Sequence, residues 1–238
     1  MTTFLGLVQR LQLECGVSGT VTTAQNQIGS IGRLVTWINQ AWDDIQTEHD
    51  DWIWMRSSAL LGGGCSFVPP AGNPVNPLGT GAGTCGIPMS SFGKWEKDTF
   101  RCYTTSVGFI NETFLDKIPF DTWRDAYMLG AMRNVQTRPV AIAFGPDESI
   151  CLGPPPNGLY TIYGDYYVAP SAMVADTDVP ALLPAQFHMI IVNKAMMKYG
   201  GYEAAPEVFQ RGNQEYQLAL DQLEALKVPE MSFAGALA

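Results

Sequence analysis

The chain has 238 residues, of which 46% are apolar, so it can bury a core large enough for one sizeable domain or two smaller ones. Only 16% of the residues are charged, which indicates surface that is buried against partners. The formal net charge of −9 excludes the basic surface of a tight nucleic-acid binder, and the 24 glycines and 16 prolines predict long loops or many turns.

Two helices are predicted at the amino-terminal end. Thr2 or Thr3 is placed to cap a first helix that runs to Cys15, where Gly16 ends it. A polar loop extends to about residue 29. Beyond it, apolar residues recur at the spacing of one helix face, at Ile31, Leu34, Val35, Ile38, Trp42 and Ile45. This second helix has the clearest amphipathic pattern in the sequence.

The period changes directly after that helix, in the stretch HDDWIWMR at residues 49–56. Trp52, Trp54 and Arg56 alternate with two apolar residues, and a period of two is typical of a β-strand. We therefore predict a strand here. The two tryptophans then mark the seam between a helical part and a β part.

The middle of the chain is predicted to be rich in strands. Residues 62–88 contain too much Gly and Pro for a helix and predict a long loop with a short strand at most. Alternation predicts a strand over 95–105, and a short helix near 121–132 follows Asp121 as its cap. Three β-rich runs over 139–169, separated by short turns, predict an antiparallel meander.

Helical spacing returns after Pro184. The run QFHMIIVNKAMMKY at 186–199 is apolar on nearly every side, as expected for a helix enclosed by its neighbours. Pro206 is suited to the first turn of a last helix. The final stretch PEMSFAGALA, residues 229–238, is more apolar than an exposed tail requires.

These elements predict an α+β protein in which the terminal helices pack as a helical bundle and an antiparallel β-rich domain is inserted between them. The predicted bundle is discontinuous and comprises residues 1–51 and 173–230. The inserted domain comprises residues 52–172, with its short helix near 121–132, and residues 231–238 form an apolar C-terminal tail.

The sequence contains few groups suited to catalysis. Both histidines have ordinary structural explanations: His49 stands at a helix end, where it is expected to be solvated, and His188 is expected to be a hydrogen-bonded core residue. His49, Asp50 and Asp51 are adjacent, so their side chains point in different directions and cannot jointly hold a metal ion. We predict no catalytic residues, no metal and no cofactor.

The cysteines and the amino-terminal stretch indicate a cytosolic protein. No secretory signal and no apolar run long enough to span a membrane are visible. The odd number of cysteines and the absence of a C-x-x-C spacing argue against a disulfide framework and a zinc site. We therefore expect all five to be reduced thiols: Cys15, Cys65, Cys85, Cys102 and Cys151. Whether Cys65 and Cys85 approach one another stays open.

The aromatic meander over residues 140–169 leaves a second class of function open. Its tyrosines could form a sugar-stacking platform, namely Tyr160, Tyr163, Tyr166 and Tyr167. Asp147, Glu148 and Asp165 could supply the paired carboxylates of a hydrolytic site. The alternative function is therefore a carbohydrate-binding or hydrolytic module.

Three stretches in this order resemble the head-to-tail connector proteins of tailed bacteriophages, also called adaptor or tail tubular protein A-like proteins. They are VTWINQAWDDIQTEHDDWIWMR, the run RPVAIAFGPDESICLGPPPNGLYTIYGDYYVAP, and the closing helices VPALLPAQFHMIIVNKAMMKYGGYEAAPEVFQRGNQEYQLALDQLEA. Together they make up 102 of the 238 residues. The Gly- and Pro-rich segment 62–88 departs from the smaller members of that family, so its role is not implied.

The resemblance implies a structural virion protein and no catalysis. Twelve copies are expected to form a ring below the portal protein and above a tail or nozzle protein, assembled in the host cytoplasm. Double-stranded DNA would pass through the ring without specific binding during genome ejection, as the acidic balance allows. As a hypothesis from composition, Met231, Phe233 and Leu237 contact the portal or a neighbouring copy, and the segment 62–88 becomes ordered against portal or tail.

Overall fold

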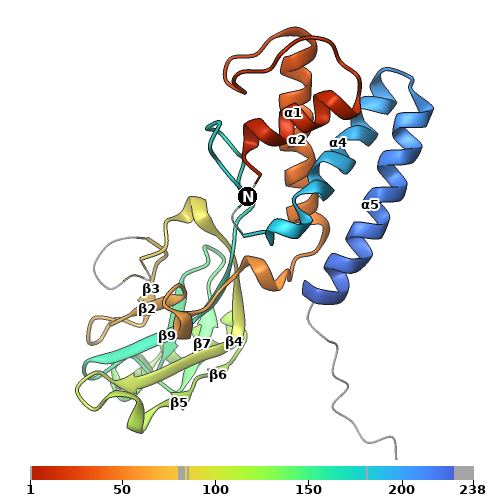
Figure 1. The fold of residues 1–238 in the computed structure, drawn as a ribbon. Helices are drawn as coiled ribbons and strands as arrows, with labels where there is room; N and C mark the ends of the chain where they lie inside the picture. Colours follow the sequence, from red (N-terminus) through yellow and green to blue (C-terminus); the bar gives the residue numbers. More distant parts are fainter. Residues whose placement is uncertain (1, 80–83, 85, 181, 228–238) are drawn as a thin grey trace, which may run out of the picture. The chain divides into compact units, whose positions relative to one another are not determined.

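The computed structural model describes residues 2–79, 84, 86–180 and 182–227. Helices come first and last along the chain and strands lie between them, so the predicted α+β fold class is confirmed (Figure 1). The chain divides into two compact units. The helical unit consists of Met1–Met55 with Pro170–Ala238, and the β unit is Arg56–Ala169.

The helical unit is built around α4 (Met189–Tyr202), which packs against α1 (Phe4–Glu14), α2 (Gly29–Glu48) and α5 (Pro206–Lys227) (Figure 1). A helix with neighbours on several sides must be apolar on all of them. Its buried residues include Ile190, Ile191, Val192, Ala195 and Met196. The prediction of an enclosed helix is confirmed.

The ends of the helices follow the predicted capping chemistry. Thr3 Oγ1 accepts a hydrogen bond from the backbone N–H of Gly6 at 3.2 Å, and Gly16 has a left-handed φ of +64° beyond the end of α1. Pro206 is the first residue of α5, where its missing N–H has no helical partner to lose. Of the predicted apolar stripe, α2 buries Leu34, Ile38, Trp42 and Ile45.

Two glycines allow α4 and α5 to approach closely. A Cβ atom at Gly200 would lie 2.7 Å from the backbone nitrogen of Phe209, and one at Gly212 would lie 2.9 Å from the backbone oxygen of Asn193. Real Cβ atoms do not come that near to backbone atoms, so a larger residue would push the helices apart. The α4–α5 pair therefore depends on glycine at both positions.

The β unit contains two sheets. The first has the order β1 (Arg56–Ser57), β9 (Tyr160–Val168), β4 (Phe92–Thr104), β5 (Thr113–Phe114), and β2 (Cys65–Phe67) also pairs with β9. The second has the order β3 (Val75–Asn76), β8 (Ile150–Gly153), β7 (Ala141–Phe144), β6 (Asp116–Lys117). The pairings are antiparallel except for β6 with β7, which is parallel.

The core of the β unit lies between the two sheets. The second sheet contributes Ile142, Ile150 and Leu152, and the first contributes residues that include Trp95, Phe100, Cys102, Ile162 and Tyr166. On the other face of the second sheet, Trp123 packs with Ala143 and Cys151. Trp123 ends the short helix α3 (Phe120–Trp123), so this segment covers the second sheet.

Three predictions for the middle of the chain need correction. The helix near 121–132 is a single α-turn, α3, followed by a π-helical turn at Arg124–Met128 and a 3-10 turn at Ala131–Asn134, and the residue before α3 is Pro119. Asp121 therefore lies inside the helix and is not its cap. The segment 62–88 holds two short strands, β2 and β3, where at most one was predicted. Their sheet partners β9 and β8 lie far along the chain, so the pairing is not visible in the local sequence.

The predicted meander is also wrong. β7 and β8 form a hairpin in the second sheet, whereas β9 belongs to the first sheet and pairs with β4. β9 is buried from Thr161 to Tyr167 and has neighbouring strands on both edges. The alternation identified each strand, but the partner of β9 lies about sixty residues earlier and leaves no trace in its own pattern.

Candidate interaction surfaces

Trp52 and Trp54 close the carboxyl end of α2 inside the helical unit. The predicted strand is wrong, because Ile53–Met55 forms a 3-10 turn and only Arg56–Ser57 is a strand. Trp52 is fully buried, and its Nε1 donates to the backbone oxygen of Ile45 at 2.9 Å. Trp54 stacks on Trp42 with ring centroids 5.8 Å apart. These indoles are packing groups, and Trp52 offers no surface to a partner.

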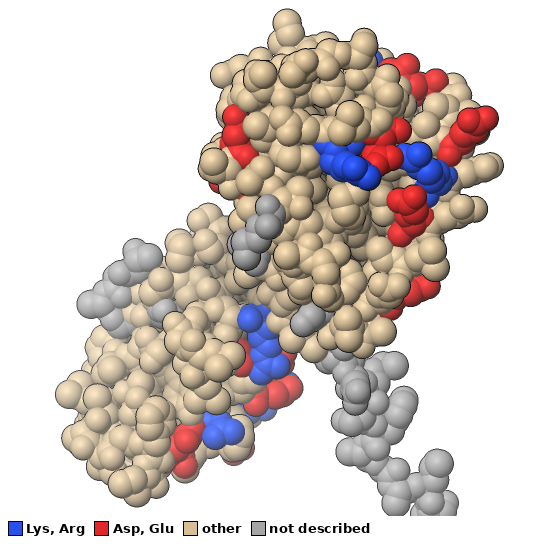
Figure 2. Space-filling model, in the orientation of Figure 1, with Lys and Arg blue, Asp and Glu red and all other residues tan. Residues whose placement is uncertain are grey.

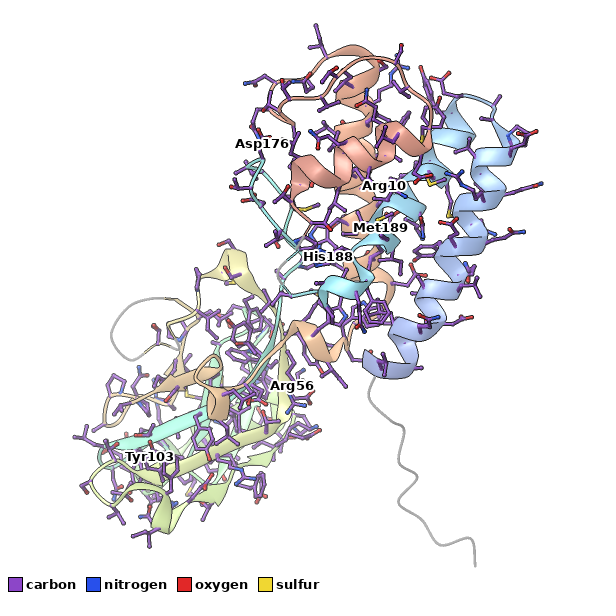
Figure 3. All side chains as sticks on the ribbon, in the orientation of Figure 1. Arg10, Arg56, Tyr103, Asp176, His188 and Met189 are labelled. Carbon is purple, nitrogen blue, oxygen red and sulfur yellow. The ribbon has the colours of Figure 1, made fainter. Side chains whose placement is uncertain are left out.

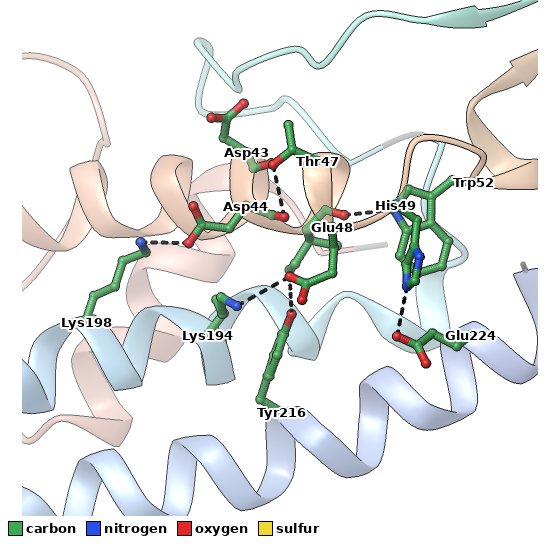
Figure 4. Close-up of polar contacts among 11 residues, drawn as sticks. Asp43, Asp44, Thr47, Glu48, His49, Trp52, Lys194, Lys198, Tyr216 and Glu224 are labelled. Atoms are coloured by element: carbon green, nitrogen blue, oxygen red, sulfur yellow. Dashed lines mark hydrogen bonds and ion pairs between the residues drawn. The ribbon is translucent and has the colours of Figure 1, made fainter.

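Polar contacts tie the end of α2 to α4 and α5 (Figure 4). Lys198 lies 2.7 Å from Asp44, Lys194 lies 3.6 Å from Glu48, and the hydroxyl of Tyr216 donates to Glu48 at 3.2 Å. Burial and the neighbouring carboxylates raise the pKa of Tyr216 above its ordinary value. The phenol therefore stays protonated and remains a donor to Glu48.

Both histidines take part in the packing of the helical unit. His49 is not a solvated helix end: its Nε2 lies 2.9 Å from Glu224 of α5, and its ring meets the Trp52 ring edge-on at 4.7 Å (Figure 4). The sequence could not show this pair, because its members are 175 residues apart. His188 is buried as predicted and contacts the backbone oxygen of Leu183 at 3.1 Å, directly before α4 (Figure 3).

Acidic charge is concentrated in the helical unit. That unit has 14 Asp and Glu against six Lys and Arg, a formal charge of −8, whereas the β unit has nine against eight, a formal charge of −1. Arg10, Arg33, Lys194, Lys198 and Arg211 each form an ion pair with a carboxylate of the same unit. Most of the visible surface is uncharged (Figure 2).

Among the described residues, the carboxylates without an ion-pair partner include three on the exposed surface of α5, which we call its outer face. Glu207, Glu215 and Asp221 are exposed on this helix, whereas its residues Tyr216 and Leu223 are buried. Among the residues that the structure describes, no Lys or Arg pairs with these three acids. This face repels polyanions.

An aromatic patch lies where α2 faces the end of α4. Trp37 contacts the rings of Tyr199 and Tyr202 at 5.9 and 5.6 Å, and the Arg33 guanidinium lies over Tyr202 at 4.5 Å. Tyr202 is 56% exposed. Aromatic and arginine side chains are enriched in protein–protein interfaces, so this patch is a candidate contact surface.

The β unit presents an apolar tip, defined as Val107, Phe109, Ile110 and Leu159. Their exposed fractions are 48%, 63%, 92% and 65%, respectively. Phe109 packs on Tyr103, which lies near the end of β4, and Arg56 lies toward the opposite end of the sheet (Figure 3). The chain enters the unit at Arg56, so the tip is remote from that entry. Nothing in the sequence pattern around VGFI had indicated an exposed cluster.

The geometry does not favour the carbohydrate alternative. Tyr163, Tyr166 and Tyr167 are buried, so their ring faces are not open to a sugar. Asp165 accepts two hydrogen bonds from the Arg56 guanidinium, at 2.7 and 3.0 Å. The Asp147 carboxylate accepts from the hydroxyl and backbone N–H of Ser149, a contact that holds a turn. These carboxylates serve local structure.

The cysteines differ from the prediction in one respect. Cys65 is disulfide-bonded, so the expectation of five reduced thiols is wrong, and Cys85 lies outside the described residues. Cys15, Cys102 and Cys151 are free, and burial raises the pKa of the Cys102 thiol to about 11. A protonated thiol is a poor nucleophile and metal ligand.

Neither a cluster of metal ligands nor a membrane-spanning helix occurs in the part of the chain that the structure describes. Within residues 2–79, 84, 86–180 and 182–227, no group of three or more His, Cys, Asp or Glu side chains could hold a metal ion. No helix in those ranges combines the length and the apolar character needed to cross a membrane. Met231, Phe233 and Leu237 lie outside the described residues, so their contacts to the portal or a neighbouring copy stay a prediction.

One comparison with known proteins identifies relatives of the chain. The model of a protein family described as SU10 adaptor protein matches residues 2–235. The match extends across the helical unit and the β unit. No curated protein matches the chain.

Proposed function

The chain belongs to the SU10 adaptor protein family, a family of phage head-to-tail adaptors, and from this premise we propose that twelve copies form a ring that extends the DNA channel from portal to tail. The observation that carries the proposal is the family match over residues 2–235, because it includes both units. The family is structural, and we assign the chain no reaction.

The proposed ring has the portal protein on one axial side and a tail or nozzle protein on the other. It is assembled in the host cytoplasm and stays in the virion, where the genome passes through it during ejection. A ring subunit must bury two lateral and two axial faces. The low charged fraction of 16% and the exposed apolar side chains of both units support such an assembly.

We propose that the helical unit walls the DNA passage. Its formal charge of −8 is the supporting observation, since a wall of the same sign as DNA lets the duplex pass without adhering. The exposed face of α5 with Glu207, Glu215 and Asp221 is the surface we assign to the channel. Double-stranded DNA is then a passenger and not a specific ligand.

We also propose that the two units are separate folding domains, with a discontinuous helical bundle interrupted by the β-rich domain. The division at Met55–Arg56 and Ala169–Pro170 supports this proposal. Trp52 and Trp54 then belong to the seam on the helical side. The segment 62–88 and the tail residues Met231, Phe233 and Leu237 are proposed contacts to portal, tail or a neighbouring copy.

Imaging of assembled particles tests the ring. Cryo-electron microscopy of DNA-filled heads bearing this protein should show a twelve-fold ring directly below the portal, into which the helical and β units can be placed. A single copy at the vertex, or density that is absent from heads and tails alike, would contradict the proposal. The isolated chain is a poor test, because a ring subunit can stay monomeric until a portal templates it.

Truncation tests the tail contacts. A chain ending at Val228 lacks Met231, Phe233 and Leu237 and should join heads at reduced occupancy, which quantitative mass spectrometry of purified particles measures. A matched control replaces the same ten residues with a Gly/Ser segment of equal length. Wild-type occupancy for the truncated chain would show that these residues are not needed for attachment.

A further inference from the structure

An apolar groove lies in the helical unit where the start of α4 meets the end of α5. It has a volume of about 500 Å³, and it is lined by Gln186, Phe187, Met189, Ile190, Ala219, Gln222, Ala225 and Leu226. None of these residues is charged, although the unit has a formal charge of −8. Met189 lies at the start of α4 (Figure 3).

The groove is open because the side chains that line it differ in size. Phe187 and Ile190 form a buried floor, and the small side chains Ala219 and Ala225 leave space above it. At the rim, Met189 is 37% and Leu226 is 59% exposed. Covering such apolar surface stabilises a protein by about 25 cal/mol per Å² removed from water.

The chain itself supplies a segment that fits this surface. The eleven residues after Lys227 are VPEMSFAGALA, with a single charged side chain. Met231, Phe233 and Leu237 recur along it at short intervals. Their apolar side chains match the uncharged lining of the groove, and a Phe or Leu side chain gains about 1.5–3 kcal/mol on full burial.

The distances allow this segment to reach the groove of its own copy. Leu226, on the groove wall, is two residues before Val228. The wall from Ala219 to Leu226 spans about 10 Å at 1.5 Å per residue, whereas eleven extended residues span up to about 40 Å. Three or four residues can therefore reverse the chain, with Pro229 favouring the turn, and the remainder can cover the wall. Tethering beside the groove gives the segment a high effective concentration there.

We infer that the groove between α4 and α5 is the docking site for residues 229–238 of the same copy in the free chain. The bound segment covers Met189 and Leu226 and inserts Phe233 over Ala219 and Ala225. This goes beyond the proposed function and does not depend on it, because the groove and the segment belong to a single chain. In a ring, the segment would have to leave its groove to contact another protein.

Photo-crosslinking of the full chain tests the inference. Benzoylphenylalanine replaces Phe233, and equal amounts of ¹⁴N- and ¹⁵N-labelled chain are mixed before irradiation. Mass spectrometry should find crosslinks to the peptides that contain residues 186–190 or 219–226, with both halves carrying the same label. Crosslinks chiefly to other peptides, crosslinks with mixed labels, or no crosslinks would each overturn the same-copy site.

A charge placed in the groove provides the second arm of the test. Ala219→Glu should lower the crosslink yield about fivefold or more, because docking would bury an unpaired carboxylate. Ala225→Glu, at an exposed position, makes the same test if Ala219→Glu fails to fold. Gln214→Glu adds the same charge at an exposed position of α5 outside the groove and should leave the yield unchanged. An unchanged yield in a folded groove variant would overturn the inference.

Discussion

The helical unit and the β unit differ in what holds them together and in what they present to solvent. In the helical unit, ion pairs join α2 to α4, a hydrogen bond from Tyr216 to Glu48 joins α5 to α2, and acids outnumber bases by eight. In the β unit, two sheets enclose an aromatic core, and acids outnumber bases by one. The excess of acidic residues in the whole chain is therefore located almost entirely in the helical unit. It belongs to the part that we assign to the DNA passage.

The largest effect on this comparison is expected from Trp52→Ala. The indole is fully buried and donates to Ile45, so its removal leaves a cavity and an unpaired carbonyl and should cost about 3–5 kcal/mol of unfolding free energy. If the units fold separately, only the helical unit loses stability. Hydrogen exchange in urea measures this, with amides of α2 losing protection and those of β4 and β9 keeping it.

Two further variants complete that test. Phe100→Ala, at a position 1% exposed in the β core, should destabilise the β unit by about 3–5 kcal/mol and leave α2 protected. Ile53→Ala, at a position 45% exposed beside Trp52, should change stability by no more than about 0.5 kcal/mol. Equal loss of protection in both units for Trp52→Ala would mean that they unfold as one.

The second-largest effect is expected from reversing the charge of the three acids on the outer face of α5. Replacing Glu207, Glu215 and Asp221 by Lys makes the proposed channel wall more positive by two charges at each position, and DNA ejection from virions carrying this variant should slow by about tenfold or more at low salt. High salt should restore the rate. Light scattering of ejected DNA follows the kinetics.

The matched control makes the same charge change in the β unit. Asp116, Asp121 and Asp125 are exposed, and their replacement by Lys should leave ejection at the wild-type rate. If this control slows ejection and the α5 variant does not, the assignment of the channel wall to the helical unit is wrong.

A smaller effect is expected from Tyr216→Phe. The ring stays buried under Lys194, but the hydrogen bond from the hydroxyl to Glu48 is lost, which should cost about 0.5–1.5 kcal/mol. Chemical denaturation monitored by helical circular dichroism measures it. Tyr202→Phe, at a ring 56% exposed, is the control and should have no measurable effect on stability. Equal losses in the two variants would mean that the Glu48 contact contributes nothing.

The smallest expected effect is a change in the pKa of one carboxyl group, that of Asp147. The hydroxyl of Ser149 donates to Asp147 at 2.7 Å and lowers the pKa of that carboxyl. A lowered folded-state pKa means that the contact stabilises the turn above the ordinary aspartate pKa and is lost as the pH falls. In Ser149→Ala, the pKa of Asp147 should rise toward its ordinary value, as carboxyl NMR titration can show. Ser106→Ala, at an exposed position, should leave it unchanged.

Local features of the fold could be predicted because neighbouring residues determine them. Thr3 and Gly16 bound α1, and Pro206 begins α5, for reasons that involve only a few adjacent backbone groups. The period of α2 and the alternation of β4 identified both elements. The fold class followed from their order along the chain.

The remainder depended on contacts between distant residues. Trp52 and Trp54 have strand spacing, yet a 3-10 turn forms because the Met55 N–H donates to the Trp52 carbonyl and the Trp52 indole donates to Ile45. His49 finds Glu224 only after α2 and α5 are packed. The groove beside Leu226 had one signal in the sequence, the two alanines at 219 and 225 on a helix whose other apolar residues are large.

The register of the first sheet has a consequence for engineering. Arg56, the first residue of the β unit, pairs with Tyr167, two residues before its last, so the chain enters and leaves through adjacent strands. Antiparallel partners have Cα atoms about 4.5–5.5 Å apart. A two-residue hairpin turn could therefore join the strands at this point and excise the whole insert. The resulting miniature would keep about half of the natural polypeptide, and other cargo could be grafted at the same point.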